Sequence, residues 1–260
     1  MNIVIIGTGN TATVLGKKLK QAGHTIVQVA GRNPAPAVLL AAELDASSCT
    51  TAAGLYRDAS LYLLAVSDNA LAGIQKEWKL PNRLLAHTAG SVSIAVLKGS
   101  SDNYGVFYPL QSLRREIPEI PEIPLLVDGN NDTAREQLQS LALSISPRVS
   151  VAADEQRLQL HLAAVLVNNF TNHLYALAEK YCKENGLDFH YLLPLIKETA
   201  TRLDRFSPQQ LQTGPAVRND TDTIARHLAL LKDDNTLMEI YKLITGSIHT
   251  THTHSLASGE

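Results

Sequence analysis

The 260-residue chain has few cysteines, little net charge and no long apolar segment. Cys49 and Cys182 are its only cysteines and lie far apart, which predicts neither a disulfide framework nor a cysteine-based metal site. A formal net charge of −2 gives no electrostatic reason to expect a nucleic acid or an anionic membrane as a partner. No apolar run is long enough to span a bilayer, and no secretory signal pattern opens the sequence. We therefore expect a cytoplasmic protein that acts on a small molecule.

The first two dozen residues carry a strand, a glycine turn and a helix in that order. Residues 3–6 are four consecutive β-branched apolar residues, typical of a strand buried on both faces. In the turn that follows, Gly7 permits a tight bend, Gly9 lets a pyrophosphate approach the backbone, and Ala12 lets the helix pack closely on the strand. The pattern indicates a dinucleotide-binding loop, with a purely structural turn as the alternative. The predicted cofactor-binding residues of the loop are Gly7, Thr8, Gly9, Asn10, Thr11 and Ala12.

An acidic residue is missing where NAD-binding proteins carry one. The second predicted strand, residues 25–30, ends near the position that reads the adenosine ribose, yet no Asp or Glu occurs between Gly9 and Glu43. Arg32 stands there instead, with Asn33 beside it, and a guanidinium suits a 2′-phosphate. The sequence therefore favours NADP, and the alternative is that Arg32 is a solvated loop charge.

Polar residues follow three further predicted strands, residues 61–66, 83–86 and 105–108. Such strand ends face the ligand in parallel sheets. Val66 and Ser67 are predicted to contact the cofactor, whereas Asp68 is either a helix N-cap or a ligand contact. His87 either touches the nicotinamide or substrate, or is a buried histidine satisfied by the backbone. Gly90, Ser91 and Gln111 are candidate contacts near the substrate or cofactor.

The periodicity changes near residue 150, which predicts an α/β domain over 1–150 and an all-helical domain over 151–260. The proline-rich segment 117–124 forbids a central strand. A helix of about thirty residues is predicted from Asp154, its N-cap, to Asn185. Other helices are predicted over residues 34–44, 68–79, 132–143, 191–203, 222–231 and 237–248. The tail histidines, His249, His252 and His254, indicate a disordered end rather than a metal site.

The long predicted helix carries a polar stripe on an otherwise apolar sequence. At about 100° per residue, His161, Val165, Asn168 and Asn172 share one face, with Asn169 beside it. Buried asparagines need hydrogen-bond partners. We expect His161 to donate a proton and Asn168 or Asn169 to hold a substrate oxygen, since histidine titrates near neutral pH. The alternative is that these groups bond across a domain or dimer interface.

A loop at residues 213–220 precedes one of the later helices. Arg218 and Asp220 are placed there to pair with each other or to cap the helix that begins near Asp222. A second hypothesis presents Arg218 to the substrate as a carboxylate-binding group.

These motifs resemble bacterial two-domain reductases related to pyrroline-5-carboxylate reductase and the β-hydroxyacid dehydrogenases. More narrowly, the chain is similar to a group that joins a Rossmann-like domain to an all-helical domain of unknown function. The matching stretches are IVIIGTGNTA, LLAVSDNAL, LAHTAGS, YPLQSL, HLAAVLVNNFTNHL and TGPAVRNDTDTIARHL. The resemblance implies NADP(H) binding, an active site between the domains and a homodimer formed through the helical domain. The catalytic lysine of β-hydroxyacid dehydrogenases is replaced by Val165, so their lysine mechanism does not transfer.

The sequence thus predicts an NADP-dependent oxidoreductase that moves a hydride between the nicotinamide and a C=O or C=N bond of a small metabolite. The rival hypothesis, supported by Val165, is a catalytically inactive dinucleotide sensor or scaffold.

Overall fold

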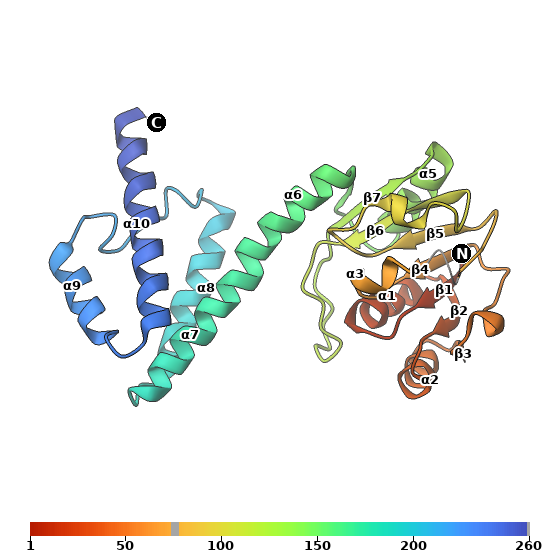
Figure 1. Cartoon of the computed structure of the whole chain (residues 1–260), viewed down its shortest axis with the longest axis horizontal. Coiled ribbons are helices and arrows are strands. Elements are labelled where there is room, and N and C mark those ends of the chain that lie inside the picture. Colours follow the sequence, from red (N-terminus) through yellow and green to blue (C-terminus); the bar gives the residue numbers. More distant parts are fainter. Residues whose placement is uncertain (74–77, 259–260) are drawn as a thin grey trace. The chain divides into compact units, whose positions relative to one another are not determined.

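The computed structural model describes residues 1–73 and 78–258, with side chains as far as residue 252 (Figure 1). By its internal contacts the chain divides into two compact units, Met1–Thr171 and Asn172–Glu260. The sheet ends at Val151, next to the predicted boundary, but the helical segment that follows it belongs with the first unit up to Thr171.

The first unit is built on an eight-stranded sheet in the order β3-β2-β1-β4-β5-β6-β7-β8. All neighbouring strands are parallel except β6 and β7. The strands are β1 (Asn2–Ile6), β2 (Thr25–Ala30), β3 (Ser47–Cys49), β4 (Leu61–Leu64), β5 (Leu84–His87), β6 (Asn103–Pro109), β7 (Leu125–Gly129) and β8 (Val149–Val151). The first six strands have the order of a Rossmann fold, which confirms the predicted class and places the reversal of strand order at β1.

The register brings the carboxyl ends of the central strands to one edge. Ile6 at the end of β1 pairs with Leu64 at the end of β4, and Leu64 pairs with His87 at the end of β5. The chain segments that follow β1, β4 and β5 therefore begin side by side, and a ligand of an open α/β sheet binds outside this edge.

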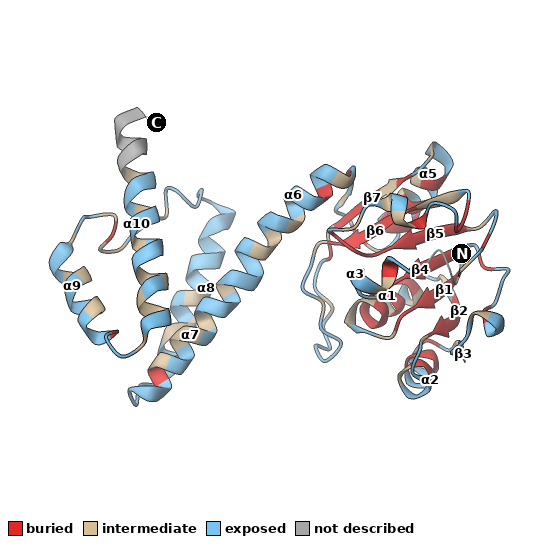
Figure 2. Cartoon of the chain, in the orientation of Figure 1, coloured by how far each residue is buried: buried red, intermediate tan, exposed pale blue. Residues whose placement is uncertain are grey.

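Helices cover both faces of the sheet, and the apolar strand residues are buried between them (Figure 2). The helices of this unit are α1 (Asn10–Gln21), α2 (Pro34–Glu43), α3 (Asp68–Leu71), α5 (Asp132–Leu143) and α6 (Asp154–Ala164), with 3-10 turns at Ala52–Gly54 and Ile94–Leu97. On α1, Leu15 and Leu19 are fully buried in the same cluster as Ile3 and Ile5 of β1. The apolar face of α1 thus fixes the helix N-terminus at the carboxyl end of β1.

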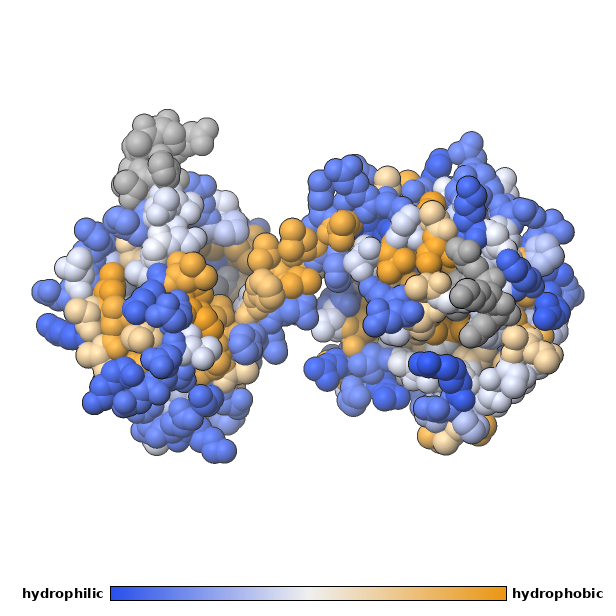
Figure 3. All heavy atoms as spheres, viewed as in Figure 1, coloured by the Kyte–Doolittle hydropathy of each residue, from blue (hydrophilic) through white to orange (hydrophobic). Residues whose placement is uncertain are grey.

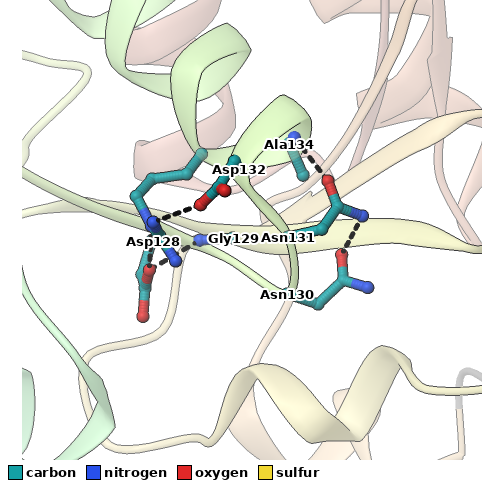
Figure 4. A network of polar contacts seen from close by, with 7 residues as sticks. Asp128, Gly129, Asn130, Asn131, Asp132 and Ala134 are labelled. Atoms are coloured by element: carbon teal, nitrogen blue, oxygen red, sulfur yellow. Dashed lines mark hydrogen bonds and ion pairs between the residues drawn. The ribbon is translucent and has the colours of Figure 1, made fainter.

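The turn between β7 and α5 shows how a helix start is fixed by side chains (Figure 4). The Asn131 side chain accepts a hydrogen bond of 2.9 Å from the N–H of Ala134 and so caps α5. Arg135 pairs with Asp128 at 3.1 Å and with Asp132 at 2.8 Å. The predicted helix over residues 132–143 is confirmed by this element.

Three details of the predicted helix starts and lengths are wrong. The helix predicted over 68–79 ends at Leu71 and passes into a turn, and residues 74–77 of that prediction lie outside the described residues. Ser67, not Asp68, occupies the N-cap position of α3. Ala153 occupies the N-cap position of α6, because Asp154 is already helical and its carboxylate bonds elsewhere.

All of the regular secondary structure described for the second unit is helical. A continuous helical run leads into it from α6 through a π-helical segment, Val165–Phe170, that sequence periodicity did not predict. Its elements are α7 (Thr171–Glu184), α8 (Leu193–Thr201), α9 (Thr221–Leu230) and α10 (Asn235–Ser258), with 3-10 turns at Phe189–Leu192 and Arg202–Asp204. The prediction of a disordered histidine-bearing tail is wrong, because α10 continues to Ser258.

A search of the described residues for a helix both long and apolar enough to cross a bilayer found none.

Candidate functional site

Gly7 makes the turn after β1 possible. Its φ is +127°, a left-handed value that favours glycine, and an added Cβ would lie 2.1 Å from the carbonyl oxygen of Ala65. The Gly7 N–H is held by the carbonyl of Ala30 at 2.8 Å. The turn therefore lies between the ends of β2 and β4 and close to Val66, one of the predicted cofactor contacts.

Gly9 and the first turn of α1 leave a place for a phosphate. Gly9 is the N-cap residue, no side chain caps the helix, and an added Cβ at Gly9 would meet nothing within 4 Å. The first N–H groups of a helix have no intrahelical partner and carry a partial positive charge. Ala12 is fully buried, so the helix lies close on β1. The predicted loop, Gly7, Thr8, Gly9, Asn10, Thr11 and Ala12, thus has a shape that fits a pyrophosphate.

Arg32 follows β2 at the same edge of the sheet. Its side chain is exposed, and no ion pair or hydrogen bond of it is found among the described residues. Asn33 is the N-cap residue of α2, again without a side-chain cap. A free guanidinium beyond the second strand fits the 2′-phosphate of NADP.

A second cluster lies beyond β5 and β6. A hydrogen bond of 2.8 Å joins Tyr108 Oη to His161 Nδ1, and the rings meet edge to face with centroids 5.8 Å apart. An added Cβ at Gly90 would lie 2.8 Å from Tyr108 Cζ and 2.9 Å from His161 Nδ1. Tyr108 is near the end of β6, His161 is on α6, and Gly90 follows β5, so three elements converge on this point.

A buried arginine lies on α6 one turn before His161. The Arg157 side chain is 1% exposed, and its Nη2 donates to the carbonyl of Val92 and, at 2.7 Å, to Asp154 Oδ1. Its Nε and Nη1 are buried with no hydrogen-bond partner found within the described part of the chain. Burial acts to raise the pKa of Asp154, but hydrogen bonds from Ser93, Arg157 and the Ile94 N–H outweigh it and hold this pKa below its usual value.

His87 is fully buried, and its Nδ1 accepts a hydrogen bond of 3.2 Å from the N–H of Ala89. Burial first, and the charge of Arg157 second, lower the pKa of His87 to about 4. The ring is therefore neutral at physiological pH. Nδ1 therefore has a backbone partner, as expected for a buried histidine satisfied by the backbone. The alternative, a contact of His87 with the nicotinamide or substrate, stays a prediction.

Asp68 and Ser91 join the segments after β4 and β5. Ser91 Oγ donates to Asp68 Oδ2 at 2.6 Å. This contact holds the predicted substrate residues Gly90 and Ser91 close to the beginning of α3.

Three further predicted site residues of the first unit, Gln111, Asn168 and Asn169, make no hydrogen bond or ion pair with this cluster in the described part of the chain. Gln111 bonds to the Glu122 carbonyl and to the N–H of Ser112, which ties down the proline-rich segment. Asn168 and Asn169 are exposed on the π-helical segment, whose wider turn breaks the regular stripe assumed from α-helical periodicity. Asn172 and Arg218 belong to the second unit and are exposed there. Asp220 caps α9 by accepting from the Thr223 N–H at 3.0 Å, which confirms one of the two alternatives for this residue.

Tyr108 and Arg157 are absent from the sequence-based candidates. Tyr108 ends a recognised strand, as His87 does, and this position was the available signal. Arg157 lies four residues before His161 on the same helical face, but its burial arises from packing that no local pattern reveals.

Comparison with known proteins gives two family matches that together cover most of the chain. Residues 2–90 match the family described as NADP oxidoreductase coenzyme F420-dependent, and residues 123–248 match a Domain of unknown function (DUF2520). No curated protein sequence matches the chain.

Solved structures extend the likeness to the whole chain. A protein of Bacteroides fragilis named as a putative NADP oxidoreductase is 40% identical, with 96% of this chain and 98% of that chain covered and a TM-score of 0.89. The fold is shared with pyrroline-5-carboxylate reductase from Streptococcus pyogenes at 16% identity, TM-score 0.61, covering 96% of this chain and 98% of that one. It is also shared with an imine reductase from Myxococcus stipitatus in complex with NADP+ at 16% identity, TM-score 0.61, covering 100% and 95%.

The strand order, the strained Gly7 turn and the uncapped α1 N-terminus define a dinucleotide-binding protein of the Rossmann class. The chain belongs to the NADP oxidoreductase family that includes the Bacteroides fragilis protein. The prediction of NADP as the cofactor is confirmed at the level of this family.

Proposed function

We propose that the chain is an NADPH-dependent reductase of a C=O or C=N bond in a small metabolite. Bound NADPH would supply the hydride from C4 of its nicotinamide. The single observation that supports catalysis, beyond binding, is the Tyr108–His161 hydrogen bond beyond the ends of β5 and β6, at the edge that holds the glycine turn. When a hydride adds to the carbon of a carbonyl or imine, the heteroatom must take up a proton. A tyrosine hydroxyl and a histidine imidazole are side-chain groups that can donate one.

The predicted residues take distinct roles in this proposal. Gly7, Gly9 and the α1 N-terminus hold the pyrophosphate, and Arg32 holds the 2′-phosphate. His161 supplies the proton. Asn168 or Asn169 holds the substrate oxygen, and Asn172 and Arg218 of the second unit bind the rest of the substrate, with Arg218 suited to a carboxylate.

We also propose a homodimer formed through the helical domain. Large apolar side chains are exposed on several helices of the second unit, and Figure 3 shows apolar residues gathered on its visible face. They include Leu174, Leu195, Leu230, Leu243 and Ile244. Large exposed apolar patches are typical of protein–protein interfaces. In a symmetric homodimer, the same patch of the two copies is buried against its counterpart.

The rival function is a dinucleotide sensor without catalysis. Val165, which stands where β-hydroxyacid dehydrogenases carry lysine, favours it. Both functions require NADPH binding, and only the reductase oxidises NADPH. The deciding assay offers purified protein NADPH with pyrroline, pyruvate and benzaldehyde as an imine, a keto acid and an aldehyde. Steady oxidation supports the reductase, whereas tight binding without turnover on any of the three supports the sensor.

The binding site itself is tested by Gly9→Ala. The Gly9 backbone has φ −84°, and open space surrounds the position, so alanine is accommodated in the free protein. A methyl group in the path of the pyrophosphate should weaken NADPH binding at least tenfold by calorimetry, with the melting temperature within about 2 °C of wild type. Gly73→Ala, at another glycine with nothing within 4 Å, is the control that should leave the affinity unchanged. Equal NADPH affinity in Gly9→Ala and wild type would contradict the placement of the phosphates.

A further inference from the structure

The Tyr108–His161 pair has room to exist only because residue 90 is a glycine. Both rings lie within 3 Å of the place where a Cβ would stand, at 2.8 Å for Tyr108 Cζ and 2.9 Å for His161 Cγ. Tyr108 is nearly buried, with 9% of its surface exposed, whereas His161 is partly exposed. The Tyr108 hydroxyl is therefore hydrogen-bonded to His161 Nδ1, and the partly exposed imidazole ring remains accessible to water.

The charge on His161 decides which way the Tyr108 hydroxyl donates. A neutral imidazole with a bare Nδ1 accepts the hydrogen bond, and the tyrosine proton then points at the ring. An imidazolium has N–H groups at both nitrogens, so Nδ1 must donate to Tyr108 Oη. The Tyr108 hydroxyl then no longer donates to the His161 ring and can donate its hydrogen to a third group.

We propose that Tyr108 and His161 form a proton relay in which Tyr108 Oη is the group that hands the proton to the substrate. The inference rests on the proposed reductase function and deepens it. As the substrate carbon accepts a hydride, the π electron pair of C=O or C=N moves to the heteroatom. With His161 as the imidazolium, that atom takes the proton of Tyr108 Oη, and Oη takes the Nδ1 proton of His161. The imidazole left neutral takes up a proton from the solvent, so that one proton is consumed per turnover. Tyr108 is thus the catalytic residue in contact with the substrate, and His161 is the proton reservoir behind it.

Charged groups from two elements, α6 and α3, lie near the pair. Arg157 is on α6, one turn before His161, Asp68 begins α3, and Asp154 begins α6. Burial raises the pKa of Tyr108, the Arg157 charge opposes this rise, and the Asp68 carboxylate adds to it. His87 on β5 stays neutral over the working range. Tyr108 is therefore protonated at neutral pH, as a donor must be.

The first experiment needs no cofactor. Nitrogen-15 NMR of histidine side chains in the free, full-length protein reports the tautomer of His161. In wild type we expect the neutral ring to be held with hydrogen on Nε2, by more than about tenfold over the other tautomer, because Nδ1 accepts from Tyr108. Tyr108→Phe should remove that preference. Tyr241→Phe is the matched control, since Tyr241 Oη bonds His227 Nδ1 at the same 2.8 Å, and it should change the His227 signal alone.

The second experiment uses whichever of the three probes is turned over with NADPH. Tyr108→Phe should lower kcat about 100-fold with KM within about threefold of wild type and NADPH affinity unchanged. His161→Gln, which removes the proton reservoir but leaves the Tyr108 hydroxyl in place, should lower kcat less than Tyr108→Phe does. Tyr241→Phe should keep wild-type kinetics.

The outcomes separate the two proposals. An unchanged His161 tautomer in Tyr108→Phe, or turnover equal to wild type in that variant, overturns the relay and leaves the reductase proposal standing. Binding of NADPH with no oxidation on any probe overturns the reductase proposal and with it the catalytic role of Tyr108. Loss of the tautomer preference together with the fall in kcat supports both.

Discussion

The two units of the chain bury their apolar side chains to very different degrees (Figure 2). In Met1–Thr171, the buried apolar residues form three clusters packed on the sheet. In the described part of Asn172–Glu260, the buried apolar residues are Cys182, Ala216 and Leu231 alone. The apolar residues of the second unit are amphipathically arranged on its helices, yet many of them face outward.

Under the proposed homodimer, this difference separates a unit with a large core of its own from one whose apolar surface a second copy covers. Hydrophobic burial is the dominant favourable contribution to folding, at about 25 cal/mol per Å² of apolar surface. The first unit gains it from sheet and helices within one chain. In the proposed homodimer the second unit would gain more of it, because a second copy would cover Leu195, Leu243 and their neighbours.

The largest expected effect comes from placing charge on that exposed surface. Leu195 and Leu243 are 65% and 75% exposed, on α8 and α10. If a second copy covers them, the double variant Leu195→Glu/Leu243→Glu buries two unpaired carboxylates, and the dimer dissociation constant should rise more than about 100-fold. Sedimentation equilibrium measures the change from dimer to monomer.

Leu39→Glu provides the control in the first unit. Leu39 lies on α2 and is 66% exposed, nearly the same as Leu195, but it belongs to the unit with a complete core. This variant should keep the wild-type mass. A monomeric wild type, or a double variant that stays dimeric, would remove the proposed explanation for the difference between the units.

The second prediction concerns the first unit and compares two ion pairs of the same spacing. Asp154–Arg157 and Asp132–Arg135 both join residues three apart, but the Arg157 side chain is 1% exposed and that of Arg135 is 39% exposed. Asp154→Asn leaves a buried guanidinium without its carboxylate, and this should lower the free energy of unfolding by about 3 kcal/mol. Asp132→Asn should lower it by less than about 1 kcal/mol, as for exposed pairs. Urea unfolding measures both, and equal losses would contradict the burial argument.

The fold could be predicted from the sequence because its signals are local. Apolar β-branched runs, the glycine turn and the Pro34 helix start each act within a few residues, and β1, β2 and α2 lie within two residues of the predicted bounds. The π-helical segment and the helical tail were missed since neither has a distinctive composition. The N-caps at Asp68 and Asp154 were wrong by one residue, because their carboxylates bond to Ser91 and to the N–H of Ile94, partners that only the tertiary structure supplies.

The parts of the candidate site also differ in whether they depend on local sequence or on tertiary contacts. The phosphate loop is continuous in sequence, so a motif reveals it. The Tyr108–His161 contact joins residues 53 apart, and Gly90 comes from a third element. His161 was found because a histidine on an apolar helix is conspicuous, whereas Tyr108 in a buried strand has the ordinary pattern of a core residue.

The third and smallest effect is a pH dependence confined to the first unit. The folded-state pKa of His87 is lowered to about 4, whereas an unfolded histidine titrates near about 6.5. Between these values the unfolded chain binds a proton that the folded chain does not, so stability falls as pH falls. From pH 7 to pH 5 the loss should be about 2 kcal/mol. The Asp154 carboxylate contributes to a separate window, since its stabilisation is lost only as the pH falls below about 4.

Urea unfolding at a series of pH values, in wild type and in His87→Gln, isolates this contribution. The variant cannot take up a proton at this position, so its stability should change with pH by about 2 kcal/mol less than wild type over the same interval, whatever its absolute stability. His173→Gln, which changes an exposed histidine of α7 in the second unit, should keep the wild-type slope. If His87→Gln and wild type lose stability in parallel, His87 is protonated in the folded protein, and burial beside Arg157 does not keep it neutral. The acid sensitivity would then have to come from other histidines of the chain, and the buried core of the first unit would not account for it.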